Sequence, residues 1–167
     1  KHGLWPHLSR RIAAPRIVFG TDAREFKLKY SVRRHCNRME RLGKAEFRIL
    51  QDRQELPRML DALYEQHIGR YQLKGEHSLF ENHLCRSFYA TLADELMDSG
   101  WLHFSELLLD GRPIALHYGF EYNKVLTWYK PAFDITHRQY SPGTVLIKHL
   151  IDYAREHRLE ALDFTIG

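Results

Sequence analysis

Cysteine is scarce in this chain, with only two among 167 residues, and Cys36 and Cys85 lie far apart with no CxxC spacing. Neither a disulfide framework nor a cysteine-based zinc site is therefore predicted. No apolar run approaches the roughly 20 residues that a membrane span needs, and no segment has the pattern of a signal peptide. These absences favour a cytoplasmic protein without a membrane span.

Glycine and proline are also few, at 10 and 6 residues, while 44% of the residues are hydrophobic and 28% are charged. This composition indicates a globular chain with room for one domain of ordinary size and a sizeable core. The 11 histidines include His67, His77 and His83, but no HxxxH or HxH spacing, so no metal site is predicted. Ser141 is not in a GxSxG elbow, so a serine hydrolase is not supported.

Positive charge is concentrated at the start of the chain. Residues 1–58 hold 15 Lys and Arg against 6 Asp and Glu, whereas residues 59–167 hold 10 against 15. The block 33-RRHCNRMER-41 could contact nucleic acid or an anionic surface, or it could be the solvated face of a helix. No RNP motif, zinc finger or helix-turn-helix pattern supports the first alternative.

Residues 1–43 are predicted to be a basic connector or the tail of a preceding segment. They include a short strand at 16–20 and a turn at Thr21-Asp22. Asp22 can cap a helix over 23–42 that is polar on most of its surface. Because the chain begins with Lys rather than Met, we expect it to be part of a longer protein.

The pattern becomes regular from residue 44, where 45-AEFRIL-50 predicts a strand. Two helices follow, over 53–73 and 79–98. The first has an apolar stripe at Leu56, Leu60, Leu63, Tyr64, His67 and Tyr71. The second repeats leucine or phenylalanine every four residues, which predicts a buried stripe at Leu84, Phe88, Leu92 and Leu96.

The period then changes from 3.6 to 2. Strands are predicted at 101–109, 112–122 and 125–131, joined by tight turns at Asp110-Gly111 and Asn123-Lys124. After a loop at 134–141, a helix over 142–158 leads to a last strand at 160–166, which should lie parallel to its predecessor. The order β-α-α-β-β-β-α-β predicts an α/β fold (a mixed α+β sheet) that is mainly antiparallel, with one parallel crossover and helices on both faces.

The loop 138-RQYSPGT-144 leads into the last helix. Ser141 suits the N-cap position and Pro142 the first helical position, so the motif could be simply a well-capped helix start. The same geometry suits a phosphate, because a helix N-terminus presents unpaired N–H groups and partial positive charge. Gly143 would let an anion approach the backbone, and Arg138 could make a bidentate phosphate contact.

Three segments together resemble the GNAT acyltransferase superfamily, in particular its CelD/BcsL-like branch (cellulose-biosynthesis-type and FemAB-related). They are 98-DSGWLHFSELLLDGRPIALHYGFEYNKVLTWYKPAFD-134, 140-YSPGTVLIKHLIDYA-154 and 159-LEALDFTIG-167. The resemblance implies a GNAT-like acyltransferase domain over 44–167, which we expect to continue beyond Gly167.

The resemblance also implies that the loop before the last helix binds the pyrophosphate of acetyl-CoA or another acyl-CoA as co-substrate. The candidate residues are Arg138, Gln139, Tyr140, Ser141, Pro142, Gly143 and Thr144. The usual signature, Arg/Gln-x-x-Gly-x-Gly/Ala, is matched at Gln139, whereas Pro142 and Thr144 occupy its two glycine positions.

Acyl transfer to an amine needs a base, N–H donors for the oxyanion and an acid for the leaving thiolate. Alternation places His117 and Glu121 on one face of their strand, and Asp163 lies in the last strand. We predict these three as candidate catalytic residues. Each also has a structural interpretation: a hydrogen-bonded His, an exposed carboxylate, and an Asp that pairs with a nearby Arg.

The expected function is N- or O-acyl transfer from acetyl-CoA or another acyl-CoA to a small-molecule or cell-envelope acceptor, without a metal. One alternative is a Fem-like transferase that uses aminoacyl-tRNA, for which the basic first third would be the tRNA contact. The other is a non-catalytic half that packs against a tandem GNAT-like half or forms a homodimer.

Overall fold

Two hairpin turns organise the centre of the sheet in the computed structural model, which describes residues 14–19 and 30–165. Asp110 and Gly111 have φ of 51° and 79°, and Asn123 and Lys124 have φ of 49° and 59°. Positive φ at both central residues is the type I′ geometry that matches the twist of antiparallel strands. The three strands that these turns join are β3 (Leu102–Leu109), β4 (Arg112–Tyr122) and β5 (Val125–Phe133).

The described residues form one six-stranded sheet in the order β1-β6-β5-β4-β3-β2. The remaining strands are β1 (Arg16–Val18), β2 (Ala45–Ile49) and β6 (Ala161–Asp163). Only β5 and β6 run parallel among these strands, and α4 (Pro142–Glu156) connects them. The predicted crossover and the mainly antiparallel sheet are confirmed.

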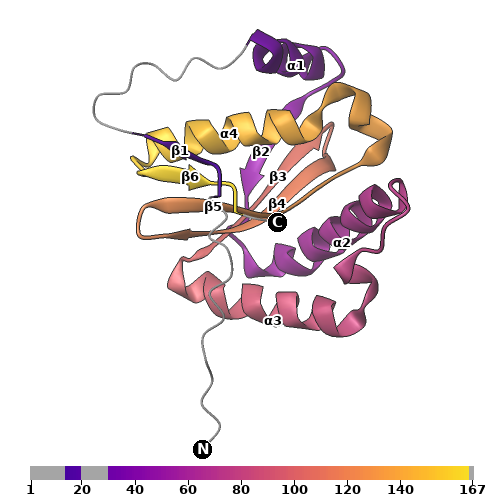
Figure 1. Cartoon of the computed structure of the whole chain (residues 1–167), viewed down its shortest axis with the longest axis vertical. Coiled ribbons are helices and arrows are strands. Elements are labelled where there is room, and N and C mark those ends of the chain that lie inside the picture. The colour runs from indigo at the N-terminus through magenta and orange to yellow at the C-terminus, as the bar shows by residue number, and fades with distance from the viewer. Residues whose placement is uncertain (1–13, 20–29, 166–167) are drawn as a thin grey trace, which may run out of the picture.

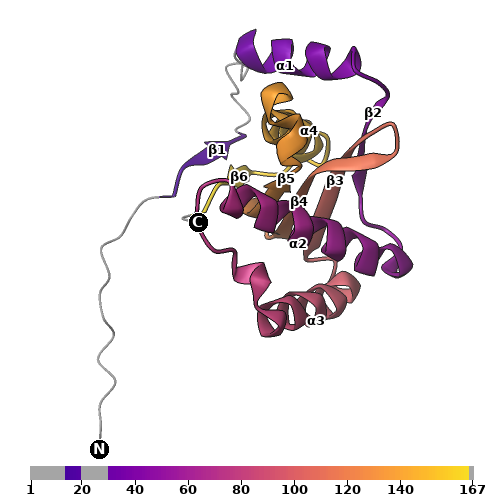
Figure 2. The same cartoon turned by 90° about the vertical axis from the view of Figure 1, so that its right-hand side faces the viewer.

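Helices cover both faces of the sheet, as predicted (Figure 1). Figure 2 shows α1 (Tyr30–Glu40) and α4 on one side, with α2 (Leu56–Gln72) and α3 (His83–Ser99) on the other. Three short 3₁₀ helices, η1 (Arg53–Glu55), η2 (Leu79–Glu81) and η3 (Ile135–Tyr140), lead into α2, α3 and α4. The segment 134–141 is thus helical rather than an open loop, because the Asp134 carboxylate accepts the Thr136 N–H and starts η3.

The stripe predicted for α3 is only partly buried. Leu92 and Leu96 are half-buried, but Leu84 and Phe88 are 66% and 60% exposed, whereas Tyr89 and Ala93 are buried. Tyr89 is turned inward because its ring packs edge-on against Phe80 at 5.1 Å and against a tyrosine of β4. The buried face of α3 is therefore displaced by one residue from the leucine and phenylalanine repeat in the sequence.

The basic first segment takes part in the fold. β1 pairs antiparallel with β6 at the sheet edge, and Met39 of α1 is fully buried in a core cluster with residues of α4. Residues on both sides of position 43 therefore share one sheet and one core. The predicted turn at Thr21-Asp22 and the helix residues 23–29 lie outside the described residues.

Candidate active site at the start of helix α4

Strands β5 and β6 part after a short parallel contact. β6 pairs with β5 only at Val125–Thr127, although β5 continues to Phe133. The Thr165 hydroxyl donates to the Trp128 carbonyl at 2.9 Å just where the strands separate. In the described part of the chain, the edge of β5 from residue 129 to 133 thus has no strand beside it.

This open edge presents one strong backbone donor near the end of β5. The Asp134 N–H donates to the Ile114 carbonyl of β4 at 2.9 Å. The N–H and C=O groups of successive residues point alternately to the two sides of an antiparallel strand. The backbone groups of Phe133 and Pro131 therefore point away from β4. Pro131 has no N–H. The Phe133 N–H is therefore the donor that faces the opening.

The start of α4 differs from the expected capped helix. Ser141 occupies the N-cap position, but φ of 55° and ψ of 52° place it in the left-handed region, and its side chain makes no capping hydrogen bond. The prediction that the Ser141 hydroxyl caps the helix is wrong, because capping by a side chain normally needs extended backbone at the N-cap, which Ser141 does not have. That carbonyl accepts the N–H groups of Thr144 and Val145 at 2.9 and 3.2 Å. Pro142 is the first helical residue, as predicted.

Gly143 carries the free N–H group of this turn. Pro142 has no N–H, and the Thr144 N–H is already bonded, whereas the Gly143 N–H has no acceptor among the described residues. A Cβ added to Gly143 would meet only Phe133 Cδ1, at 4.0 Å, so the space above its backbone is open. The turn thus suits one anionic oxygen of a pyrophosphate, held by one backbone donor rather than by several.

Guanidinium groups from two other helices lie beside this turn. Arg38 of α1 donates to the Gln139 carbonyl at 3.4 Å, and its guanidinium lies 4.7 Å from the centroid of the Tyr140 ring. Arg70 of α2 lies 5.9 Å from the Phe133 ring, and its buried Nε has no partner within the described residues. Arg138 and Gln139 are exposed. The sequence signalled Arg38 only as part of a basic block, and nothing in it signalled Arg70.

The predicted His117 lies inside the protein, fully buried on the sheet face that α4 covers. Its Nε2 is 3.0 Å from the Thr127 carbonyl, to which it donates, and its ring stacks on Trp128 at 4.8 Å. Burial, together with the nearby His103, lowers the pKa of His117 well below its ordinary value, so the ring is neutral.

The backbone next to His117 depends on Gly119. The pairing of β4 with β5 shifts between Tyr118 and Phe120, which marks a bulge at this glycine. A Cβ at Gly119 would come closer than 3.0 Å to Thr127 O and to His117 Nε2. The missing side chain is what lets the imidazole reach the Thr127 carbonyl.

Glu121 lies on the same face of β4 as His117 but nearer its end. Its carboxylate accepts the Tyr153 hydroxyl of α4 at 2.7 Å. Burial, and then this carboxylate, raise the pKa of Tyr153, so the phenol stays a donor. Glu121 pairs with Leu126, whereas the α4 turn follows the other end of β5, roughly 24 Å away at 3.4 Å per residue. The structure therefore does not bring Glu121 beside the turn.

Asp163 is the last residue of β6 and pairs in register with Thr127, where the strands part. Its Oδ1 accepts the Thr165 N–H at 2.9 Å, which orders the chain after the strand. Of the three predicted catalytic residues, it is the one placed at the opening between β5 and β6.

Two further features bear on cofactors and on membranes. Within residues 14–19 and 30–165, no three His, Cys, Asp or Glu side chains are grouped as a metal ion would need. The helices in that part of the chain are all too short or too polar for a bilayer crossing.

Comparison with known proteins gives a family and a fold. A family model described as an acetyltransferase (GNAT) domain matches residues 27–167. Among solved structures, the C-terminal domain of a putative lysylphosphatidylglycerol synthetase from Agrobacterium fabrum is similar, with a TM-score of 0.59 and 16% identity over 86% of this chain. The L-PGS structure from Bacillus licheniformis has a TM-score of 0.55 and 13% identity over 81% of this chain.

The chain spans only 44% and 38% of those two proteins, and at these identities the similarity establishes the fold alone. No curated protein gives a significant match in sequence.

Proposed function

This chain belongs to the GNAT acetyltransferase family, and we propose that its domain transfers the acyl group of an acyl-CoA, in the first place acetyl-CoA, to an amine or hydroxyl. The observation that carries the proposal is the free N–H and open space at Gly143 beside the unpaired edge of β5. The acceptor that we propose is a small molecule or cell-envelope precursor, which rests on the CelD/BcsL-like segments of the sequence.

The residues around the turn have separate roles in this proposal. The Gly143 N–H and the Arg138 guanidinium would hold the donor's pyrophosphate, with Arg38 adding charge from α1. Bound acyl-CoA supplies a thioester, from which the acceptor takes the acyl group as its own nitrogen or oxygen replaces the thiolate. The Phe133 N–H at the open edge lies at the same end of β5 as Gly143 and would be a further donor for that pyrophosphate.

A base must take the proton of the acceptor. His117, Glu121 and Asp163 remain the candidates, and we favour Asp163 because it stands where β5 and β6 part. Its Oδ1 is engaged by Thr165, which leaves Oδ2 for a substrate ammonium. Asp163→Asn should therefore lower kcat by at least tenfold while KM for acetyl-CoA changes little.

Calorimetry with acetyl-CoA tests the donor site. We expect Gly143→Asp to weaken binding at least tenfold, because the carboxylate fills the open space and repels phosphate. Asn123→Asp is the matched control, since it adds the same charge in an exposed turn at the opposite end of β5 from the start of α4 and should bind acetyl-CoA normally. The donor assignment is overturned if the natural chain binds no acetyl-CoA at millimolar concentration, or if Gly143→Asp binds it equally well.

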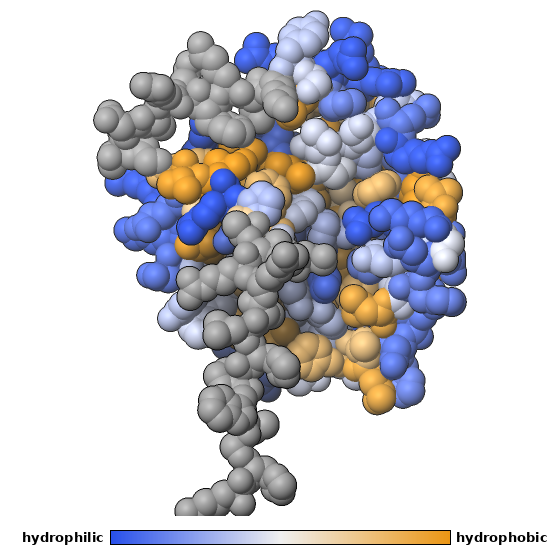
Figure 3. Space-filling view, in the orientation of Figure 1, coloured by the Kyte–Doolittle hydropathy of each residue, from blue (hydrophilic) through white to orange (hydrophobic). Residues whose placement is uncertain are grey.

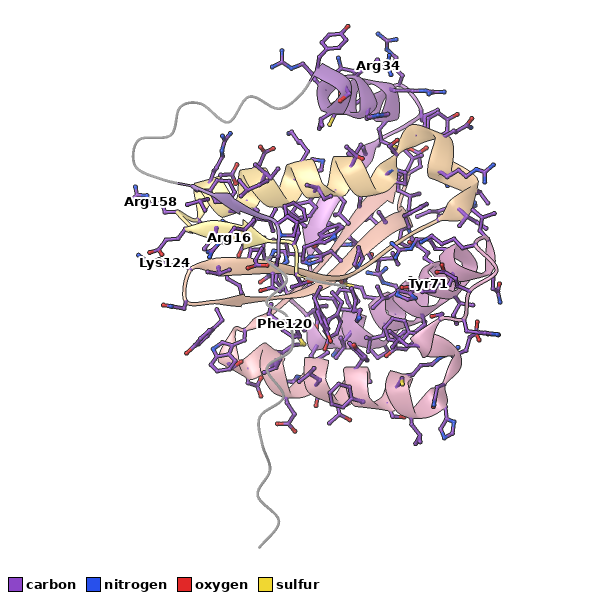
Figure 4. The ribbon with its side chains drawn as sticks, in the orientation of Figure 1. Arg16, Arg34, Tyr71, Phe120, Lys124 and Arg158 are labelled. Atoms are coloured by element: carbon purple, nitrogen blue, oxygen red, sulfur yellow. The ribbon has the colours of Figure 1, made fainter. Side chains whose placement is uncertain are left out.

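Aminoacyl-tRNA is the second candidate donor, and two observations favour it. The α4 turn offers one free N–H where a pyrophosphate normally finds several, and Arg33, Arg34 and Arg41 line a cleft on the outer face of α1. Figure 4 shows Arg34 on this outward side, and Figure 3 shows mostly hydrophilic residues over α1. The names of the two similar structures also describe the synthesis of a lysyl rather than an acetyl product.

The salt dependence of binding distinguishes the two candidate donors. Binding of tRNA through several arginines would weaken steeply and log-linearly with salt concentration, and Arg34→Glu would reduce the slope. Acetyl-CoA binding would respond only weakly. A chain that binds neither donor would support the third alternative, a non-catalytic half that packs against a tandem domain.

A further inference from the structure

Strand β2 forms one edge of the sheet, and its outer side has no neighbouring strand among the described residues. The Leu50 N–H donates to the Phe104 carbonyl of β3 at 2.8 Å, so the backbone groups of the even-numbered residues point toward β3. The N–H and C=O groups of Ala45, Phe47 and Ile49 therefore point outward, because these groups alternate along an antiparallel strand. None of them makes a hydrogen bond within the described part of the chain.

This edge lacks most of the features that prevent another strand from pairing. Natural sheet edges are usually blunted by proline, by a bulge, by a covering segment or by charged side chains. β2 contains no proline or glycine, and its register with β3 does not shift over Ala45–Ile49. It does carry charges, at Glu46 and Arg48, but these are opposite in sign. A regular edge of this kind is a template for the addition of a further strand.

The α4 side of this edge is apolar. The Phe47 ring stacks on His149 of α4, with centroids 5.2 Å apart, yet Phe47 is only half-buried. Ile49 is half-buried as well, and both residues border a hollow of about 470 Å³. An added strand could therefore cover these two side chains with apolar side chains of its own.

The opposite side of the edge carries the charges. Since Phe47 faces α4, alternation places Glu46 and Arg48 on the face that α2 covers. Both are exposed, and Arg48 pairs with Glu55 at 3.1 Å. If a second copy of β2 is added antiparallel about a twofold axis at Phe47, each Glu46 lies opposite Arg48 of the second copy. The charge pattern of β2 is thus complementary to itself.

The charges also select this register over its neighbours. An axis at residue 46 would place Glu46 opposite Glu46 and Lys44 opposite Arg48 of the second copy, and an axis at residue 48 would place Arg48 opposite Arg48. Like charges directly opposite one another destabilise a strand pair, whereas opposite charges stabilise it. Larger shifts would pair Phe47 with residues beyond the ends of β2.

We propose that β2 is the interface of a homodimer, in which two copies join their sheets through an antiparallel β2–β2 pair centred on Phe47. The outward backbone groups of Ala45 and Ile49 would then pair with those of the second copy, and the two Phe47 residues would pair with each other. Strands β3 and β4 lie between this interface and the open edge of β5. The dimer is therefore independent of the proposed acyl transfer.

Analytical ultracentrifugation of the chain between about 5 and about 500 μM tests this interface, because dimerisation follows mass action. We expect the mass to rise from the 19.9 kDa of one chain toward twice that value. Glu46→Arg would set like charges opposite each other and should weaken dimerisation at least tenfold. Glu95→Arg makes the same change of charge on the exposed face of α3, so as the matched control it should dimerise normally.

A double variant tests the register itself. Glu46→Arg combined with Arg48→Glu exchanges the two charges and keeps them complementary, so it should restore dimerisation to within about threefold of the natural chain. Hydrogen exchange of the natural chain needs no variant. The outward Phe47 amide should exchange at least tenfold more slowly at the high concentration, whereas the Arg48 amide, which points toward β3, should be protected at both concentrations.

Three outcomes would overturn the inference. A mass that stays at 19.9 kDa up to about 500 μM would leave this edge to a partner of another kind. Dimerisation that Glu46→Arg leaves undiminished would place the contact elsewhere on the surface. A folded double variant that remains monomeric would refute the Phe47-centred register. Where Glu46→Arg does not fold, the exchange of the Phe47 amide decides, and equal rates at both concentrations would refute the interface.

Discussion

Replacing Gly119 of β4 with alanine would put a methyl group at the point where β5 bulges opposite this residue. The added Cβ would lie closer than 3.0 Å to three atoms, Thr127 O and the Nε2 and Cε1 atoms of His117. The first belongs to backbone in the middle of the sheet, and the other two belong to a ring that Trp128 holds by stacking. Neither can move without disturbing the core, so the strain cannot be relieved by the rotation of a flexible side chain.

The expected cost has two parts. Overpacking of a dense core typically costs about 1–3 kcal/mol. Separation of the strands would also break the 3.0 Å hydrogen bond from His117 to the Thr127 carbonyl, and an unpaired buried group costs about 1–3 kcal/mol more. We therefore expect Gly119→Ala to lower the free energy of unfolding by about 2–6 kcal/mol, a large share of the roughly 5–15 kcal/mol typical of a domain.

Urea unfolding at 25 °C measures this loss, followed by tryptophan fluorescence because Trp128 stacks on His117. With a slope of about 2 kcal/mol per molar urea, the midpoint should fall by roughly 1–3 M. Gly143→Ala is the matched control, since its Cβ would meet only one carbon at 4.0 Å and its stability should stay within about 1 kcal/mol of the natural chain. Equal midpoints for Gly119→Ala and the natural chain would refute the close approach at the bulge.

Arg58→Met should lower the free energy of unfolding by about 3 kcal/mol, because it leaves the buried Glu106 carboxylate without guanidinium hydrogen bonds of 3.0 and 2.8 Å. Arg53→Met removes only exposed ion pairs and should cost much less in the same urea titration; equal costs would contradict this ranking. Burial above all lowers the pKa of His67 to about 4, so its neutral ring contributes full stability above about pH 6.5 and progressively less toward pH 4. The free energy of unfolding should rise with pH over that window, and His67→Phe should reduce the slope by up to about 1.4 kcal/mol per pH unit; an unchanged slope would show that His67 does not titrate this way. Phe88→Ser should change stability by less than about 0.5 kcal/mol, because that ring is 60% exposed, and a larger loss in urea would mean that the ring is covered.

Local signals account for the parts of the fold that were predicted correctly. The Asp110-Gly111 and Asn123-Lys124 turns were readable because positive φ depends on the turn residues themselves. The switch from helical to strand periodicity at residue 101 could also be predicted, because each period reflects which face of an element is buried. The element order then followed from short connections and crossover handedness.

Where tertiary contacts decide which side chains are buried, the sequence alone did not predict the structure. The α3 leucine repeat indicated burial, but the rings of Phe80 and Tyr118 bury Tyr89 and leave Leu84 exposed. At the α4 turn, the Ser-Pro pair predicted the N-cap position correctly, but the left-handed backbone of Ser141 removes its hydroxyl from capping.

The candidate site also combines features that the sequence predicted with features that it did not. The sequence predicted that the loop 138–144 begins a helix. The contact of Arg38 with Gln139 joins residues 101 apart in the sequence, so no local pattern predicts it. Likewise, His103 and Tyr153 meet only because α4 crosses the sheet above β3, so their contact has no sequence signature.

Helix α4 gives its start a charge preference. Aligned peptide dipoles place about half a positive charge there. Gly143 has a free N–H and lies near Arg38 and Arg138, all of which favour an anion. The preference for an anion therefore comes from three parts of the chain, α1, η3 and α4, and only the last two are neighbours in the sequence.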